Sequence, residues 1–266
     1  MKVWQRLQQS LAWRFFPHAG LGARTASGLA LRVTDKGDWA SASEVFIERT
    51  YDPFFHHLLG VRAWVDVGCN TGFFSLGLVE YLRAQANRVP ATRAVLLDAS
   101  ARSVAKARDL AAANDLSGWM CRRCVIGPAG QTVPFYEFKY SVTSSLFPKA
   151  RPERVEQVAT TLLADAIGTP PADFDLLKVD IEGAEKFLFD QEEALLRAFP
   201  LVLMEWHQPE WPGSALERWL DATNAELLEV RSLPCDWDPV RQGHSFGSPV
   251  GLALWRNQGP SAAGRS

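Results

Sequence analysis

A nine-residue segment, WVDVGCNTG, constrains the fold of this chain more than any other part of the sequence. It joins an apolar run that contains Asp66 to two glycines, Gly68 and Gly72, and an apolar stretch begins directly afterwards at Phe73. This order is typical of a buried strand, a tight turn and the start of a helix. Because free N–H groups at a helix start favour electronegative ligand atoms, the segment predicts a ligand-binding turn in an α/β fold.

Asn70 indicates which ligand this turn binds. A dinucleotide-binding turn follows the pattern G-x-G-x-x-G, which would place glycine at position 70. Asn70 keeps a pyrophosphate from approaching closely, and this disfavours a nicotinamide-dependent dehydrogenase. The pattern D-x-G-x-N-x-G instead resembles the first motif of class I S-adenosylmethionine (SAM) methyltransferases. An ordinary strand-to-helix turn is the alternative.

The composition is typical of one large, soluble α/β domain. The chain has 266 residues, of which 47% are hydrophobic and 22% charged. A net charge of -2 gives no general reason to expect a nucleic-acid partner. No run of eighteen apolar residues predicts a transmembrane segment, and the N-terminus lacks the apolar core of a signal peptide. A cytoplasmic location is therefore the default expectation.

The four cysteines do not indicate a disulfide framework in a chain of this length. Cys121 and Cys124 form a C-x-x-C pair, but no second pair or suitably spaced histidines accompany it. This pattern is not that of a zinc site, so we expect free thiols.

Strands and helices alternate along most of the chain, which predicts a mostly parallel sheet with helices on both faces. The expected strands are 29–33, 63–67, 94–98, 119–126, 132–138, 155–160, 174–180, 201–206, 227–230 and 250–255. The expected helices are 41–59, with a new turn at Pro53, then 73–86, 100–114, 161–167, a helix ending at 199, and 216–223.

We expect one core domain over residues 61–256. An extension of helix and strand over residues 1–60 is expected to pack on it, and the tail at 257–266 is expected to be disordered. Residues 1–16 read as an amphipathic helix with basic residues off its apolar face. We expect this helix to dock on the core, and weak contact with a membrane surface is the alternative.

Ionisable residues lie at or near the carboxyl ends of three apolar strands: Asp66, then Asp180 and Glu182, then Glu205 and His207. Lys178 shares a strand face with Asp180 by the two-residue period, and a lysine in a buried strand needs a charged partner. Ligands of open α/β sheets bind beyond these strand ends, so we expect one common site.

Asp98 ends the predicted strand at 94–98, which follows the strand that contains Asp66. An acid at this position of an α/β sheet binds both hydroxyls of a ribose. It lies further from Gly68 than the usual ~20 residues, and the polar loop at 84–93 accommodates the difference. The alternative, that Asp98 caps the following helix, does not exclude the first role.

Several motifs together resemble the FkbM family of SAM-dependent methyltransferases. The matching segments are VDVGCNTGFFSL, the element Ser144-Ser145-Leu146, DLLKVDIEGAEKFLF and LVLMEWH. The resemblance covers roughly residues 44–210, and Glu44 and Tyr51 also fit the approach to the first strand. The chain departs from the family at Asp98-Ala99, where Glu-Pro is more frequent.

The resemblance implies a class I methyltransferase with a Rossmann-like, mostly parallel sheet, extended here by an N-terminal helical segment. It implies SAM as the cofactor and methyl transfer to an oxygen, often a hydroxyl of a sugar or natural product. The residues expected to bind SAM are Asp66, Gly68, Cys69, Asn70, Thr71, Gly72, Asp98 and Ser100.

A sugar hydroxyl is a poor nucleophile, so a base near it is expected to remove its proton. Asp180 and His207 are the candidates for this base. Glu182 and Glu205 would orient the substrate or the base, and Lys178 would hold the carboxylates by charge-assisted hydrogen bonds. A purely structural pair at a strand end is the alternative for Glu205 and His207.

We expect no bound metal ion. The alternative is a divalent ion held by Asp180, Glu182, Glu205 and His207, since oxygen ligands suit magnesium. A nucleic-acid methyltransferase is disfavoured by the charge balance and by the missing D/N-P-P-F/Y loop. The partial match at residues 52–55 is better explained by a helix start. A SAM-binding protein without catalysis is disfavoured by the intact ionisable cluster. The acceptor and the oligomeric state stay open.

Overall fold

The computed structural model describes residues 21–85, 91–138, 152–182, 184–207, 212–233 and 250–258. The expected N-terminal helix at 1–16, the element Ser144-Ser145-Leu146 and most of the C-terminal tail lie outside these ranges.

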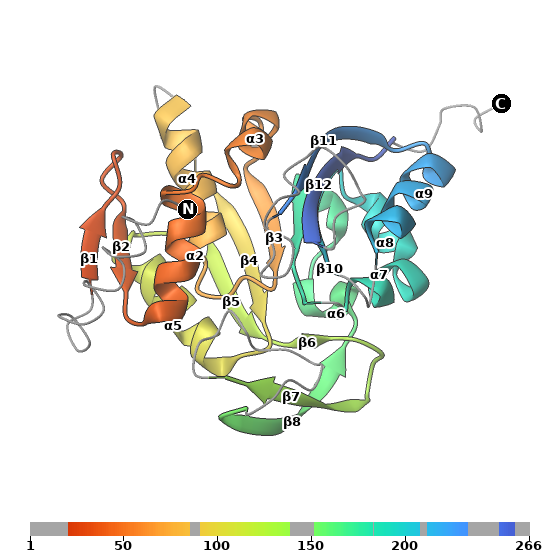
Figure 1. Ribbon diagram of the computed structural model, residues 1–266, viewed down its shortest axis with the longest axis horizontal. Helices are drawn as coiled ribbons and strands as arrows, with labels where there is room; N and C mark the ends of the chain where they lie inside the picture. The colour runs from red at the N-terminus through yellow and green to blue at the C-terminus, as the bar shows by residue number, and fades with distance from the viewer. Residues whose placement is uncertain are drawn as a thin grey trace.

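Seven strands form the central sheet, in the order β11-β12-β10-β9-β3-β4-β5 (Figure 1). The strands are β3 (Ala63–Val67), β4 (Arg93–Asp98), β5 (Trp119–Arg123), β9 (Leu176–Val179), β10 (Leu201–His207), β11 (Glu226–Ser232) and β12 (Val250–Arg256). From β5 to β10 the neighbours run parallel, whereas β12 runs antiparallel to β10 and β11. The strand order reverses between β3 and β9, and ligands of such sheets bind at this switch.

Helices cover both faces of the sheet, as the alternation of elements predicted (Figure 1). One core contains Trp64 and Leu96 of the sheet together with α4 and α5, and the other contains Val65 and Leu97 together with four further helices. The helices of the first face are α4 (Phe73–Gln85) and α5 (Ala101–Ala113). Those of the second face are α6 (Leu163–Ile167), α7 (Glu185–Gln191), α8 (Glu193–Ala198) and α9 (Gly213–Thr223). Alternate residues of each strand therefore enter different cores, and the expected fold class is confirmed.

The segment before β3 packs on the first face. It contains the hairpin of β1 (Leu21–Arg24) and β2 (Ala30–Val33), then α2 (Lys36–Phe46), α3 (Asp52–Phe55) and a 3-10 turn, η1 (His56–Leu58). The prediction of a helix from residue 41 was wrong at its start, because Asp35 accepts hydrogen bonds from the first turn of α2 and caps it. Lys106 of α5 forms ion pairs with Asp35 and Asp38, which fixes α2 beside α5.

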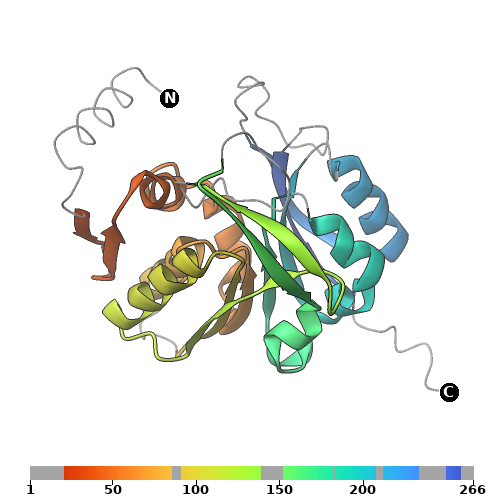
Figure 2. The ribbon, with the colours of Figure 1, turned by 90° about the horizontal axis from the view of Figure 1, so that it is seen from below.

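A second, three-stranded sheet lies at one end of the central sheet (Figure 2). It contains β6 (Val125–Ile126), β7 (Thr132–Glu137) and β8 (Arg154–Thr161), and a 3-10 turn, η3 (Pro171–Asp173), precedes β9. The expected continuous strand at 119–126 was wrong, because β5 ends against β4 at Arg123 and Val125 and Ile126 pair instead with β8. Cys121 and Cys124 are free thiols, as expected. Among the described residues, no helix is both long and apolar enough to cross a membrane.

Candidate active site

The turn after β3 is closed by contacts that require glycine at position 68. Gly68 has a φ of +71°, and a Cβ at this position would lie 1.6 Å from the carbonyl oxygen of Asp180. The N–H groups of Gly68 and Cys69 both donate to the Leu97 carbonyl, at 2.9 and 3.0 Å. Gly72, at φ +85°, ends the turn and starts α4. The predicted strand, turn and helix are therefore confirmed, with the end of β9 pressed against the turn.

Asn70 connects this turn to two other elements. Its φ is +47°, a left-handed conformation that asparagine tolerates better than most residues. The backbone N–H donates to Asp98 Oδ2 at 2.8 Å, and the side-chain amide donates to Ser41 Oγ at 2.9 Å. Ser103 Oγ donates to Asn70 Oδ1 at 3.4 Å. Asn70 thus fixes the turn against α2, α5 and the end of β4.

Asp98 lies at the end of β4, where the sequence placed a ribose-binding acid. Its two carboxylate oxygens accept backbone hydrogen bonds from Ser100 and Asn70, at 2.7 and 2.8 Å. Burial raises the pKa of Asp98 to about 7, against the lowering effect of these two bonds. The N-cap of α5 is Ser100, whose Oγ accepts a hydrogen bond from Ser103 N. Ser100 therefore caps this helix in place of Asp98.

Lys178 is buried between two carboxylates. Its Nζ lies 3.4 Å from Asp66 Oδ1 and 3.4 Å from Asp180 Oδ2, and it donates to the Gly68 carbonyl at 3.1 Å. Asp66 faces Lys178 because the two residues are register partners in β3 and β9. Ser75 completes the network by donating to Asp66 Oδ2 at 2.7 Å. Lys178 therefore has the charged partner that its buried position requires, and it has one on each side, Asp66 and Asp180.

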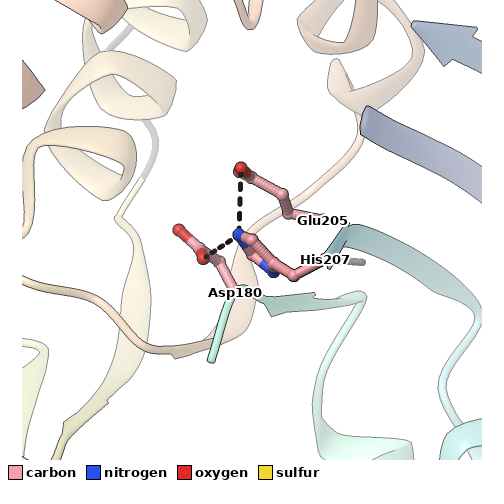
Figure 3. A group of neighbouring side chains, drawn as sticks. All are labelled: Asp180, Glu205 and His207. Atoms are coloured by element: carbon pink, nitrogen blue, oxygen red, sulfur yellow. Dashed lines mark ion pairs between the residues drawn. The ribbon is translucent and has the colours of Figure 1, made fainter. Parts of the chain in front are cut away.

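His207 lies among three carboxylates, two of which Figure 3 shows. Its Nδ1 is 3.0 Å from Glu185 Oε1, and its Nε2 is 3.4 Å from Glu205 Oε1 and 3.9 Å from Asp180 Oδ1. Burial alone would lower the pKa of His207, but Glu185 and Glu205 outweigh it and raise the pKa to about 12. Burial and the nearby Asp180 raise the pKa of Glu205 to about 7. His207 is therefore a cation at neutral pH.

The turn and the ionisable cluster open into one pocket. The predicted site residues that line it are Gly68, Cys69, Asn70, Asp98, Lys178, Asp180, Glu182 and Glu205. The other predicted site residues, which are absent from the lining, are Asp66, Thr71, Gly72, Ser100 and His207. Of these, Asp66, Ser100 and His207 contact lining residues, whereas Thr71 is buried and Gly72 ends the turn. Glu182 has a φ of +56°, in the left-handed region.

The pocket also has walls that sequence reasoning did not assign to the site. Ser41 and Glu44 reach it from α2, Tyr51 from the segment after α2, and Phe135 from β7. Glu44 and Tyr51 were noticed only as part of the family resemblance. Burial, then Glu205 and Asp180, raise the pKa of Glu44 to about 8. The polar turn, the acid at the end of β4 and the aromatic side chains of Tyr51 and Phe135 form a lining that fits SAM.

We expect Glu44→Gln to change how stability depends on pH. The pKa of Glu44 is about 8 in the folded chain and 4.5 as an ordinary glutamate, so the native state alone holds this proton between these values. Its stabilising effect is complete below pH 4.5 and is lost as the pH rises through 8. A shift of one pKa unit corresponds to about 1.4 kcal/mol, so we expect the variant to gain about 4 kcal/mol over the wild type between pH 5 and 9.

Urea unfolding of both proteins at pH 5, 7 and 9 measures this difference. Glu48→Gln, at an exposed position near the end of α2, is the control for a change of net charge. A constant difference between wild type and Glu44→Gln at all three pH values would contradict the buried, neutral carboxyl.

Comparison with known proteins agrees with this geometry. Residues 120–232 match the family model described as Methyltransferase FkbM domain, a range that contains Lys178, Asp180 and His207. No curated protein matches the chain.

Three of the solved structures to which the chain is similar are methyltransferases by their descriptions. A putative O-methyltransferase from Klebsiella pneumoniae is 11% identical with a TM-score of 0.46, and the match covers 95% of this chain and 97% of that one. An O-methyltransferase from Bacillus cereus in complex with SAH is 14% identical with a TM-score of 0.43, covering 83% and 86%. A putative tRNA methyltransferase from Streptococcus pneumoniae in complex with S-adenosyl-L-methionine is 10% identical with a TM-score of 0.43, covering 79% and 75%. The predicted resemblance to the FkbM family is confirmed over residues 120–232, and with it a SAM-dependent methyltransferase on the class I fold.

Proposed function

We propose that the protein transfers a methyl group from SAM to a hydroxyl oxygen of a small molecule or glycan in the cytoplasm. The observation that carries this proposal is the position of Asp180, which lines the pocket and whose carbonyl touches the glycine turn. SAM supplies the methyl group, so that an O–C bond forms as the S–C bond breaks and the hydroxyl proton passes to a base.

Asp180 suits the role of this base better than His207. With a pKa of about 12, His207 already carries a proton at neutral pH and does not accept another. Lys178 contacts Oδ2 of Asp180 while His207 faces Oδ1, so the carboxylate is held from two sides. This arrangement orients a proton acceptor beside the expected methyl position.

The charge of the pocket supports a neutral acceptor over a nucleic acid. Five carboxylic acids line it, namely Glu44, Asp98, Asp180, Glu182 and Glu205, and these share the lining with one lysine. Nucleic-acid binding depends on lysine and arginine side chains that neutralise phosphates. A SAM-binding protein without catalysis is the remaining alternative, but it gives no reason for the Lys178–Asp180–His207 arrangement.

We expect Asp180→Asn to reduce kcat by about 10²–10⁴-fold, because general-base catalysis contributes a factor of this size. The affinity for SAM should stay within a few-fold of the wild type, since the turn after β3 is unchanged. Transfer of a labelled methyl group to a panel of sugars and polyhydroxylated natural products measures turnover, and calorimetric titration measures SAM affinity.

Asp190→Asn, an exposed aspartate of α7, is the matched control and should retain full turnover. Unchanged turnover in Asp180→Asn would remove Asp180 as the base. Labelling of transfer RNA but of no hydroxyl acceptor would favour the nucleic-acid alternative. Absence of SAM binding in the wild type would overturn the proposed function as a whole.

A further inference from the structure

Three side chains of different chemistry converge at the carboxyl ends of β9 and β10. They are Asp180, Glu205 and His207, and one ligand atom from each lies within 4.8 Å of the other two. Figure 3 shows the imidazole between the two carboxylates, which approach it from different sides. Such a set of two oxygens and one nitrogen is close enough to surround a single ion at bond lengths of about 2.0–2.4 Å.

A buried carboxylate fixes the orientation of the imidazole. Glu185 is 0% exposed, and its Oε1 lies 3.0 Å from Nδ1 of His207. This contact leaves Nε2 as the nitrogen that faces Glu205 and Asp180. Histidine ligands of metal ions characteristically use one ring nitrogen for the ion and the other for a carboxylate of this kind.

The two oxygens of Asp180 are divided between different partners. Lys178 contacts Oδ2 at 3.4 Å, whereas Oδ1 faces His207. An ion beside Oδ1 therefore leaves the ion pair with Lys178 in place. Asp180 and Glu205 also line the pocket, so water or an acceptor oxygen has access to the same position.

We propose that Asp180, Glu205 and His207 bind one divalent transition-metal ion, with Glu185 as the residue that orients His207. The imidazole favours a first-row transition metal over calcium or magnesium, which prefer sites made of oxygen alone. The ion takes the place of the proton that Nε2 carries between the two carboxylates when no ion is bound. Binding itself does not depend on the proposed function.

The role of the ion does rest on the proposed function. A metal ion that coordinates the acceptor hydroxyl lowers its pKa and fixes its oxygen for methyl transfer. The hydroxyl proton would pass to Oδ2 of Asp180, the oxygen that the ion leaves free, and the ion would keep its charge, so the step needs no oxidant or reductant.

Binding of Mn²⁺ to the full chain after removal of metals with a chelator tests the proposal. The loss of the free Mn²⁺ resonance on titration gives the stoichiometry, and we expect one ion per chain. Glu205→Gln and His207→Gln should each weaken binding by at least about tenfold, and Glu185→Gln should weaken it by about 10–100-fold. Excess Ca²⁺ should displace Mn²⁺ poorly.

Glu44→Gln is the matched control, because Glu44 lines the same pocket but does not belong to the three-residue cluster. We expect it to retain wild-type Mn²⁺ affinity. Circular dichroism of each variant shows whether it is folded, and Glu205→Gln, which preserves shape, serves if His207→Gln does not fold. No Mn²⁺ binding by the wild type, or equal affinity in Glu205→Gln and Glu44→Gln, would overturn the site. Methyl transfer at full rate by chelator-treated protein would overturn the role of the ion and leave the proposed function intact.

Discussion

Gly68→Ala is expected to remove a large part of the stability of the native state. A Cβ at position 68 would lie 1.6 Å from the Asp180 carbonyl oxygen and 2.7 Å from its carbon. Both are backbone atoms at the end of β9, so no side-chain rotation relieves the contact. The φ of +71° adds about 1–2 kcal/mol for any residue with a Cβ. We expect a total loss above about 4 kcal/mol, against a usual domain stability of about 5–15 kcal/mol.

Gly130→Ala separates the two contributions to this loss. Gly130 has a similar φ of +75°, but nothing lies within 4 Å of a Cβ built there. We expect this variant to lose only the conformational part, about 1–2 kcal/mol. Urea unfolding followed by circular dichroism compares both with the wild type. Equal losses at positions 68 and 130 would show that the contact with Asp180 does not require glycine.

The sequence predicts most of the elements because their signals are local. Asp66 within an apolar run, Gly68 after it and Phe73 at the next helix start act within ten residues of one another. The alternation of strand and helix then restricts the sheet to a mostly parallel arrangement. The break at Cys124 escaped prediction, because it depends on the pairing of Val125 and Ile126 with β8, a strand much further along the chain.

The contacts within the site are harder to predict from sequence than the elements, because they depend on strand register and helix packing. The two-residue period placed Lys178 and Asp180 on one face, but only the pairing of β3 with β9 makes Asp66 the second partner of Lys178. Glu44 lines the pocket because α2 packs beside the sheet, and no pattern within α2 indicates this. Which ring nitrogen of His207 faces Asp180 likewise depends on the buried Glu185, which contacts the other ring nitrogen.

Lys178→Met is expected to destabilise the protein by about 3–5 kcal/mol, as usual when one partner of a buried ion pair is removed. Lys178 is 2% exposed and Asp66 is 0% exposed, so methionine would leave the Asp66 carboxylate without a cation. The loss of Lys178 costs less free energy at Asp180, because its side chain is 26% exposed to water. Chemical unfolding measures the loss, and Lys186→Met, at an exposed position on α7, should stay within about 0.5 kcal/mol of the wild type.

The pH dependence of the Lys178→Met variant identifies Asp66 as the source of this loss. Burial already raises the pKa of Asp66, and Lys178 is the strongest influence that lowers it. Without Lys178 the pKa rises further, so the folded variant holds a proton that the unfolded chain releases above about pH 4. Its stability must then fall as the pH rises from 5 to 8. Adding Asp66→Asn removes the charge that lacks a partner, so the double variant should regain stability at pH 8 and lose this dependence. A double variant less stable than Lys178→Met at pH 8 would show that the Asp66 carboxylate contributes stability without its lysine.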